Sequence, residues 1–165
     1  MELAEKLHEI FHGSSRAHGS FMIQNGSLGQ KIQGKAKTIK TIGAGIKHWQ
    51  DHIDGKEGLG VIPIDEENSV RWGAIDIDIY SLNLEKLVAK IEEFKLPLVV
   101  CRSKSGGAHV FCFLKEKVPA ADMQEKLREI SAGLGYGGVE IFPKQREVLV
   151  ERGDIGSWLN MPYFD

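Results

Sequence analysis

Residues 72–80 read Trp-Gly-Ala-Ile-Asp-Ile-Asp-Ile-Tyr, a β-branched run with two carboxylates one residue apart. In an extended strand, successive side chains point to opposite faces of the sheet. Asp76, Asp78 and Tyr80 are therefore expected on one face and the three isoleucines on the other. The run predicts a strand with one apolar face for a core and one face that carries two negative charges roughly 7 Å apart.

Two like charges on one strand face are unfavourable unless a positive charge compensates them. Mg²⁺ and Mn²⁺ take oxygen ligands and are usually held by one or two carboxylates together with substrate phosphates. The alternative is an exposed strand face with two solvated aspartates, and the Asp-x-Asp pair by itself leaves both interpretations open.

The composition is typical of a globular protein, since 42% of the 165 residues are hydrophobic and 27% are charged. No apolar run approaches the roughly 20 residues of a membrane span, and residues 1–12 are charged rather than signal-like. Cys101 and Cys112 show no Cys-x-x-Cys spacing, which argues against a zinc site. We expect a cytoplasmic protein, or one in the host cytoplasm if a phage encodes it, with no membrane contact and no zinc.

A basic block interrupts an otherwise acidic chain of net charge −2. No acidic residue occurs between Glu9 and Asp51. Because this interval holds six of the 21 basic residues, the rest of the chain carries 15 basic and 23 acidic residues, a balance of −8. Such a block is expected of a surface that contacts nucleic-acid phosphates, although a solvated loop would show it too. Its members are Arg16, Lys31, Lys35, Lys37, Lys40 and Lys47.

Residues 1–69 are predicted to form a small α/β lobe that carries this basic block. Apolar residues at helical spacing indicate helices, and short apolar runs indicate strands. Gly, Gln and Lys predominate between residues 25 and 40 and predict a mobile basic loop or a loose hairpin. The expected elements are helices 2–11 and 42–53 and strands 21–23 and 58–64.

Residues 70–165 are predicted to form a second lobe with the order β-α-β-β-α-β. This is the split βαβ order of ferredoxin-like and RNA-recognition (RRM) folds, in which the first strand is central and the third and fourth strands flank it. We therefore expect an α+β protein of one unit, residues 1–165, built of two lobes. The expected elements are strands 70–79, 97–102, 108–114 and 137–142 and helices 83–94 and 120–133.

This topology brings acidic side chains from separate strands together. If Val110 and its alternate neighbours face the helices, His109 and Phe111 face the opposite side. If Ile141 faces the helices, Glu140 joins that opposite face. Asp76 and Asp78 would then share it with His109 and Glu140, a set that is hard to explain as a core. Phe111 and Tyr80 are expected to pack between the lobes rather than to stack on bases.

The start of the third strand, residues 102–109, reads Arg-Ser-Lys-Ser-Gly-Gly-Ala-His. Glycines let the backbone approach an anion, and hydroxyl and backbone N–H groups donate to phosphate oxygens. A tight hairpin turn would need only the two glycines. The basic and hydroxyl residues beside them favour a phosphate-binding turn.

Three motifs in this order resemble those of the archaeo-eukaryotic primase superfamily. Asp76-Ile77-Asp78 resembles its hhhDhD strand, residues 103–109 resemble its S-x-H-type turn, and Glu140 resembles its third acid on a later strand. The flanking pieces resemble the primase-polymerase domains of mobile elements and conflict systems. These pieces are Arg16-Ala17-His18-Gly19 and residues 48–52, 140–145 and 160–164.

The resemblance implies template-directed nucleotidyl transfer by a DNA primase or DNA polymerase that makes and extends primers on single-stranded DNA, in the replication of a mobile element or phage. Asp76, Asp78 and Glu140 would bind two divalent metal ions, Mg²⁺ or Mn²⁺, which align the 3′-hydroxyl with the α-phosphate. The substrates would be NTPs or dNTPs, and the partners a template, a primer and a helicase or accessory priming domain outside this chain. Glu140 departs from the family pattern because many relatives have Asp there, and the zinc cluster of many relatives is missing from the sequence.

The resemblance also implies nucleotide contacts for the turn and for the segments after the fourth strand. Hydroxyls and a histidine of the turn would hold the triphosphate, with its two basic residues as assistants. The later lysine and asparagine would contact nucleotide or template, although a solvated or packing role is the alternative for each. The residues concerned are Arg102, Ser103, Lys104, Ser105, His109, Lys144 and Asn160. The resemblance further assigns a functional role to Arg16 and His18.

Two other classes of protein stay open. A metal-dependent nuclease would also use clustered acids with a lysine, as in Glu140 and Lys144, but it would not require the phosphate turn. A non-catalytic RRM-like module would share the element order and bind single strands by aromatic stacking. Aspartates in the middle of its central strand would repel the nucleic-acid backbone.

Overall fold

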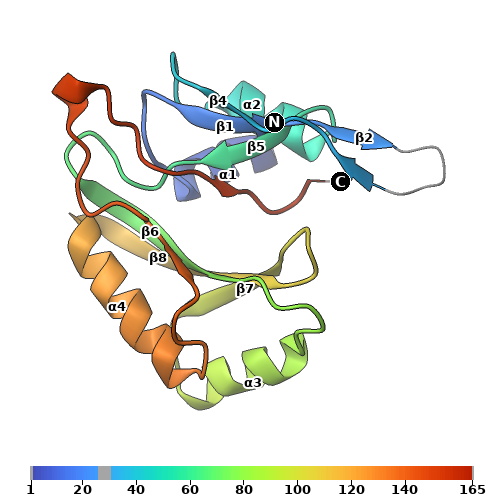
Figure 1. Ribbon diagram of the computed structural model, residues 1–165, viewed down its shortest axis with the longest axis vertical. Helices are drawn as coiled ribbons and strands as arrows, with labels where there is room; N and C mark the ends of the chain where they lie inside the picture. Colours follow the sequence, from blue (N-terminus) through green and yellow to red (C-terminus); the bar gives the residue numbers. More distant parts are fainter. Residues whose placement is uncertain (1, 26–30, 165) are drawn as a thin grey trace.

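The computed structural model describes residues 2–25 and 31–164 and has an α+β architecture (Figure 1). These residues contain four α-helices, two four-stranded antiparallel sheets and a separate two-stranded pair. The helices are α1 (Glu2–Ile10), α2 (Ile46–Ile53), α3 (Leu84–Glu93) and α4 (Ala120–Gly133). The strands are β1 (His18–Phe21), β2 (Ile23–Asn25), β3 (Lys31–Gln33), β4 (Lys37–Ile39), β5 (Gly58–Val61), β6 (Ser69–Ile77), β7 (Leu98–Arg102), β8 (Ala108–Pro119), β9 (Glu140–Phe142) and β10 (Leu159–Asn160). No helix in the two described ranges is long and apolar enough to cross a membrane.

The N-terminal sheet has the order β10-β5-β1-β4. Its edge strand β10 comes from the far end of the chain and pairs with β5, with Leu159 opposite Val61 and Asn160 opposite Gly60. In Figure 1 the C-terminal segment, in red, accordingly runs beside β5. The sequence did not predict this return, which places the C-terminal segment in the N-terminal sheet.

Residues 25–40, expected to be a loop or a loose hairpin, contain β3, β4 and the last residue of β2, and in place of the predicted strand 21–23 the chain has β1 and β2, which are separated at Met22. β2 pairs with β3 as an antiparallel hairpin, which confirms the hairpin alternative, and β4 joins the edge of the N-terminal sheet. Residues 26–30 lie outside the described part of the chain, as do the side chains of residues 23–33, including that of Lys31.

The C-terminal sheet has the order β7-β8-β6-β9, so the first of its strands in sequence, β6, is central. This confirms the predicted strand order. Asp76 of β6 lies opposite His109 of β8 on one side and opposite Glu140 of β9 on the other. Figure 1 shows α3 and α4 on the face of this sheet that is turned away from the N-terminal lobe.

Each face of the C-terminal sheet contributes to a different core. Ile75, Ile77 and Val110 point toward the helices and pack with residues such as Leu127 of α4. On the opposite face, Trp72 and Phe111 pack with α1 and α2 through a cluster of aromatic rings. The ring centroid of Phe11 lies 5.1–5.4 Å from those of Trp49, Trp72, Phe111 and Phe113. The predicted alternation of faces is therefore confirmed, as is the packing role of Phe111.

The predicted strand 70–79 is too long at its C-terminal end. β6 ends at Ile77, so Asp78 lies beyond the last paired residue, and Tyr80 is 82% exposed and does not pack between the lobes. The reason is that the partner strand β8 begins at Ala108, opposite Ile77, so Asp78 has no residue of β8 to pair with. A further difference is α2, which begins at Ile46 rather than at residue 42.

Candidate active site

Asp76 forms the centre of the candidate site because of its register in the sheet. His109 Nε2 lies 3.4 Å from Asp76 Oδ1, and only 8% of His109 is exposed. Glu140, on the other neighbouring strand, is exposed and pairs with Lys144, whose Nζ lies 3.0 Å from Glu140 Oε1. The carboxylates of these two directly opposed residues thus contact different side chains, the imidazole of His109 and the ammonium group of Lys144.

The turn between β7 and β8 encloses the end of β6. Ser103 N–H donates to Gly107 O at 3.0 Å, and Gly106 N–H donates to Ser103 O at 3.1 Å. A Cβ atom at Gly107 would lie 2.0 Å from Ile77 O, so the turn needs a residue without a side chain at its closest approach to the strand. Glycine is therefore required here for contact between two backbones.

This turn also fixes the position of Asp78. Ser105 Oγ donates to Asp78 Oδ1 at 2.8 Å, and Ser105 Oγ lies 3.2 Å from Ser103 Oγ. Lys104 extends toward the N-terminal lobe, with its Nζ 5.2 Å from the ring centroid of Phe21. The Asp78 carboxylate, which lies outside the strand, is thus held by the Ser105 hydroxyl group of the predicted phosphate turn.

Lys144 is held in place by a buried side chain of α4. Gln124, 1% exposed, donates through Nε2 to Pro143 O at 2.8 Å and to Lys144 O at 2.7 Å. The Lys144 ammonium also lies 5.1 Å from the centroid of the Phe142 ring. These contacts direct the cation toward Glu140 and the sheet face that carries Asp76.

The residues predicted to bind metal and nucleotide line two neighbouring cavities. The larger, of about 560 Å³, is lined by Asp76, Asp78, Ser103, Lys104, Ser105, His109, Glu140, Phe142, Lys144, Trp158, Leu159 and Asn160. The second, of about 250 Å³, shares Ser103, Lys104, His109 and Asn160 and adds Arg102 with the aromatic residues Phe21, Tyr163 and Phe164. The structure thus brings every predicted nucleotide contact to one region, while the role of each stays a prediction.

Asn160 carries an unpaired polar atom in this region. Its Oδ1 is buried and has no hydrogen-bond partner, and the residue lines both cavities from β10. A buried acceptor without a donor is unfavourable. A ligand hydroxyl or amino group would pair with this oxygen only if the Asn160 side chain turned toward the cavity.

The three carboxylates do not form a finished metal site. Among residues 2–25 and 31–164, no group of three or more His, Cys, Asp or Glu side chains is placed to hold a metal ion. Asp76, Asp78 and Glu140 pair instead with protein groups. Their chemistry still fits a hard divalent cation, because all three offer carboxylate oxygens to one cavity. Binding would require these side chains to leave their present partners.

The described side chains of the basic block do not line either cavity. Lys37 lies 4.0 Å from Glu57, Lys47 pairs with Asp51, and Arg16 donates to the Asp154 carbonyl at 2.8 Å. The other two described members, Lys35 and Lys40, are exposed on the N-terminal lobe. A role of the block in binding nucleic acid stays a prediction.

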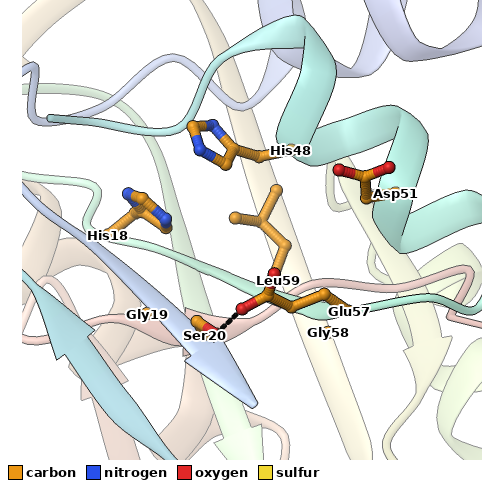
Figure 2. A pocket seen from close by; sticks show the side chains of 8 residues that line it. All are labelled: His18, Gly19, Ser20, His48, Asp51, Glu57, Gly58 and Leu59. Atoms are coloured by element: carbon orange, nitrogen blue, oxygen red, sulfur yellow. Dashed lines mark hydrogen bonds between the residues drawn. The ribbon is translucent and has the colours of Figure 1, made fainter. Parts of the chain in front are cut away.

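His18 lines a separate small pocket, which Figure 2 shows between β1 and α2. It is 4% exposed, its Nδ1 donates to Ile42 O at 2.7 Å, and its ring centroid lies 4.3 Å from that of His48. Burial is the main cause that lowers the pKa of His48 below its usual range, and electrostatic interaction with the neighbouring His18 lowers it further. His18 thus connects β1 to α2 and to the segment before it, and it does not line the cavity of Asp76, Asp78 and Glu140.

Sequence reasoning missed two aromatic residues of the larger cavity, Phe142 and Trp158. Trp158 lies just before residues 160–164, from which only Asn160 was singled out, as a nucleotide contact or a packing residue. Its position depends on the pairing of β10 with β5, residues about 100 positions apart in the chain.

Comparison with known proteins agrees with this arrangement of strands, turn and acids. Residues 29–164 match the family described as the archaeo-eukaryotic primase domain of the TOTE conflict system. A search of curated proteins found no match. The chain belongs to this archaeo-eukaryotic primase family, and its membership indicates nucleotidyl transfer of the primase type.

Proposed function

We propose that this chain catalyses template-directed nucleotidyl transfer, as a DNA primase or DNA polymerase that makes and extends primers on single-stranded DNA. The observation that carries the proposal is the register of the C-terminal sheet. It places Asp76 between Glu140 and His109, and the hydroxyl-rich turn after β7 lines the same cavity. Acids for metal binding and donors for phosphate are thus adjacent.

Asp76, Asp78 and Glu140 would hold two divalent ions, Mg²⁺ or Mn²⁺. Directly opposed residues of neighbouring strands have Cβ atoms about 4.5–5.5 Å apart, so the charges of Asp76 and Glu140 repel each other, and a divalent cation between them would offset this repulsion more fully than the Lys144 ammonium does. When bound, such ions activate the attacking hydroxyl and neutralise charge on the phosphates. No zinc is expected.

The residues of the turn would hold the triphosphate of an incoming NTP or dNTP. Ser103 and Ser105 present hydroxyl groups, and Lys104 presents an ammonium group, to the cavity that Asp78 also lines. His109 would donate to a phosphate oxygen from the floor of the cavity, and Arg102 would act from the neighbouring one. Lys144 and Asn160 would contact the nucleotide from the opposite side.

The basic block of the N-terminal lobe would contact the phosphates of the template or primer. The C-terminal sheet would serve as an RRM-like platform for catalysis, in the replication of a mobile element or phage, with a helicase or accessory priming domain as a partner.

A purely binding RRM-like module is less well supported, because Phe111 on the sheet face is fully buried and cannot stack on a base. A nuclease is the second candidate, since Lys144 and Glu140 pair at 3.0 Å in the cavity.

The proposal is tested with a 5′-labelled primer annealed to an unlabelled single-stranded DNA template, and with the template alone plus a labelled nucleotide. Both reactions contain the four nucleotides in Mg²⁺ or Mn²⁺. Metal-dependent products longer than the labelled strand, or new strands without a primer, are expected for the natural chain and not for Asp76→Asn. Asp122→Asn, on the exposed side of α4, is the matched control and should act as the natural chain does. Shortened strands without any extension would establish a nuclease, and unchanged strands would contradict catalysis.

A further inference from the structure

The indole of Trp158 lies on a row of residues without bulky side chains in the N-terminal sheet. Gly60 of β5 is the register partner of Gly19 of β1, and Gly19 is the register partner of Thr38 of β4. A Cβ atom at Gly19 would lie 2.1 Å from Trp158 Cδ2, and one at Gly60 would lie 2.1 Å from Trp158 Cε3. The benzene ring of the indole therefore occupies the space that side chains would need at both glycines.

The orientation of the ring is fixed at its polar edge. Trp158 Nε1 donates to Thr38 Oγ1 at 3.1 Å, so the indole spans β5, β1 and β4 and its one donor is already used. Asn160 lies opposite Gly60 on the other side, in the same row, and lines the larger cavity as Trp158 does. The row thus faces the cavity.

Part of the indole surface that the glycines leave free lines the larger cavity, and another part packs against the hydrophobic core. Because one side is pressed against backbone, the part of Trp158 that lines the cavity is the side away from the glycines. Asp76, Glu140 and Lys144 line the same cavity from the C-terminal sheet. A flat ring with fixed orientation thus lies across the cavity from the groups proposed to bind metal and phosphate.

We propose that Trp158 is a stacking platform for a nucleobase bound at this site, an inference that rests on the proposed function. Aromatic rings stack on any base because every base has a π-face, so such a platform suits a site that must accept all template sequences. The base comes either from the DNA strand or from the incoming triphosphate. Lys144 and Asn160 line the same cavity, and the Lys144 ammonium is a group that could contact the phosphates of the ligand.

The test uses the fluorescence of the chain itself. Trp49 and Trp72 are 0% exposed, which leaves Trp158 as the tryptophan that a ligand can reach. The natural chain is titrated separately with oligo-dT, an abasic oligonucleotide of equal length, dATP and inorganic tripolyphosphate. No mixture contains both template and nucleotide, so no turnover occurs.

We expect a ligand with bases, oligo-dT or dATP, to quench the fluorescence of Trp158. Its counterpart without bases, the abasic oligonucleotide or tripolyphosphate, should cause no quenching. Quenching by oligo-dT alone assigns the base to the DNA strand, and quenching by dATP alone assigns it to the incoming nucleotide. Trp158→Leu should bind the quenching ligand about 5- to 150-fold more weakly, the effect of one base–aromatic stack, and bind the counterpart unchanged. Trp158→Phe should retain most of the affinity.

Thr38→Val provides a second test if Trp158→Leu fails to fold. It removes only the acceptor at the exposed edge of the indole, and it should weaken binding of the ligand with bases selectively. The absence of quenching by both oligo-dT and dATP, or an equal loss for ligands with and without bases, would overturn the inference. A chain that stacks a base but incorporates no nucleotide would instead overturn the proposed function alone.

Discussion

Gly107→Ala should destabilise the chain and separate the turn from Asp78. The added methyl group would lie 2.0 Å from Ile77 O, 3.1 Å from Ile77 C and 3.2 Å from Asp78 Cα. These are all backbone atoms, so no side-chain rotation can relieve the clash. We expect the free energy of unfolding to fall by about 1–3 kcal/mol, the effect of an extra methyl group in filled space. For a chain of this length the Tm would fall by roughly 2–12 °C.

The matched control for this substitution is Gly133→Ala. A Cβ atom at Gly133, the last residue of α4, meets no heavy atom within 4 Å. We expect it to raise the free energy of unfolding by up to about 1 kcal/mol, because alanine favours the helix. Urea unfolding with a common m-value measures both variants. A change of less than about 0.5 kcal/mol for Gly107→Ala, or equal changes for the two variants, would refute the assigned contact between turn and strand.

Three further outcomes are expected. Ser105→Ala removes the hydroxyl that donates to Asp78 and should reduce nucleotide incorporation by about 10- to 100-fold, measured as kcat/KM, while Tm changes by only a few degrees. Burial lowers the pKa of His52 in the folded chain. Its Nδ1 accepts from Leu59 N–H and its Nε2 donates to Pro162 O. The His52 imidazole therefore binds a proton more readily in the unfolded chain than in the folded one. Unfolding free energy should therefore decline as the pH falls below about 6.5, and less steeply in His52→Gln, as thermal melts across pH will show. Mn²⁺ at about 100 times its Kd should stabilise the natural chain by about 2.7 kcal/mol and Asp78→Asn by clearly less, measured by urea unfolding at fixed metal concentration.

The sequence predicted the C-terminal sheet well because its signals are local. Alternation of isoleucine with aspartate fixes which side of β6 meets the helices, and the order of elements fixes which strands flank it. The sequence pattern alone therefore predicts that Asp76, His109 and Glu140 share one face. The helix over residues 120–133 was also predicted with the observed bounds.

The sequence could not predict features that depend on distant pairing. Asp78 was assigned to the strand because the pattern continues past Ile77, but the position of the turn after β7 decides where pairing ends. Gly60 lay within the predicted strand 58–64 and Gly19 outside any predicted element, and only the register of β1 with β5 shows both glycines as the support for Trp158. Charge pattern likewise predicted a cluster of acids without revealing that each has a protein partner.

The most direct test of the central claim is incorporation of single nucleotides on a primer–template that offers one unpaired template base. The four nucleotides are supplied separately, in Mg²⁺ or Mn²⁺, to the natural chain, to Asp76→Asn and to the control Asp122→Asn. The account predicts that the natural chain and the control add the complementary nucleotide, and that Asp76→Asn adds none. Addition regardless of the template base, or full activity of Asp76→Asn, would contradict template-directed transfer at this cavity.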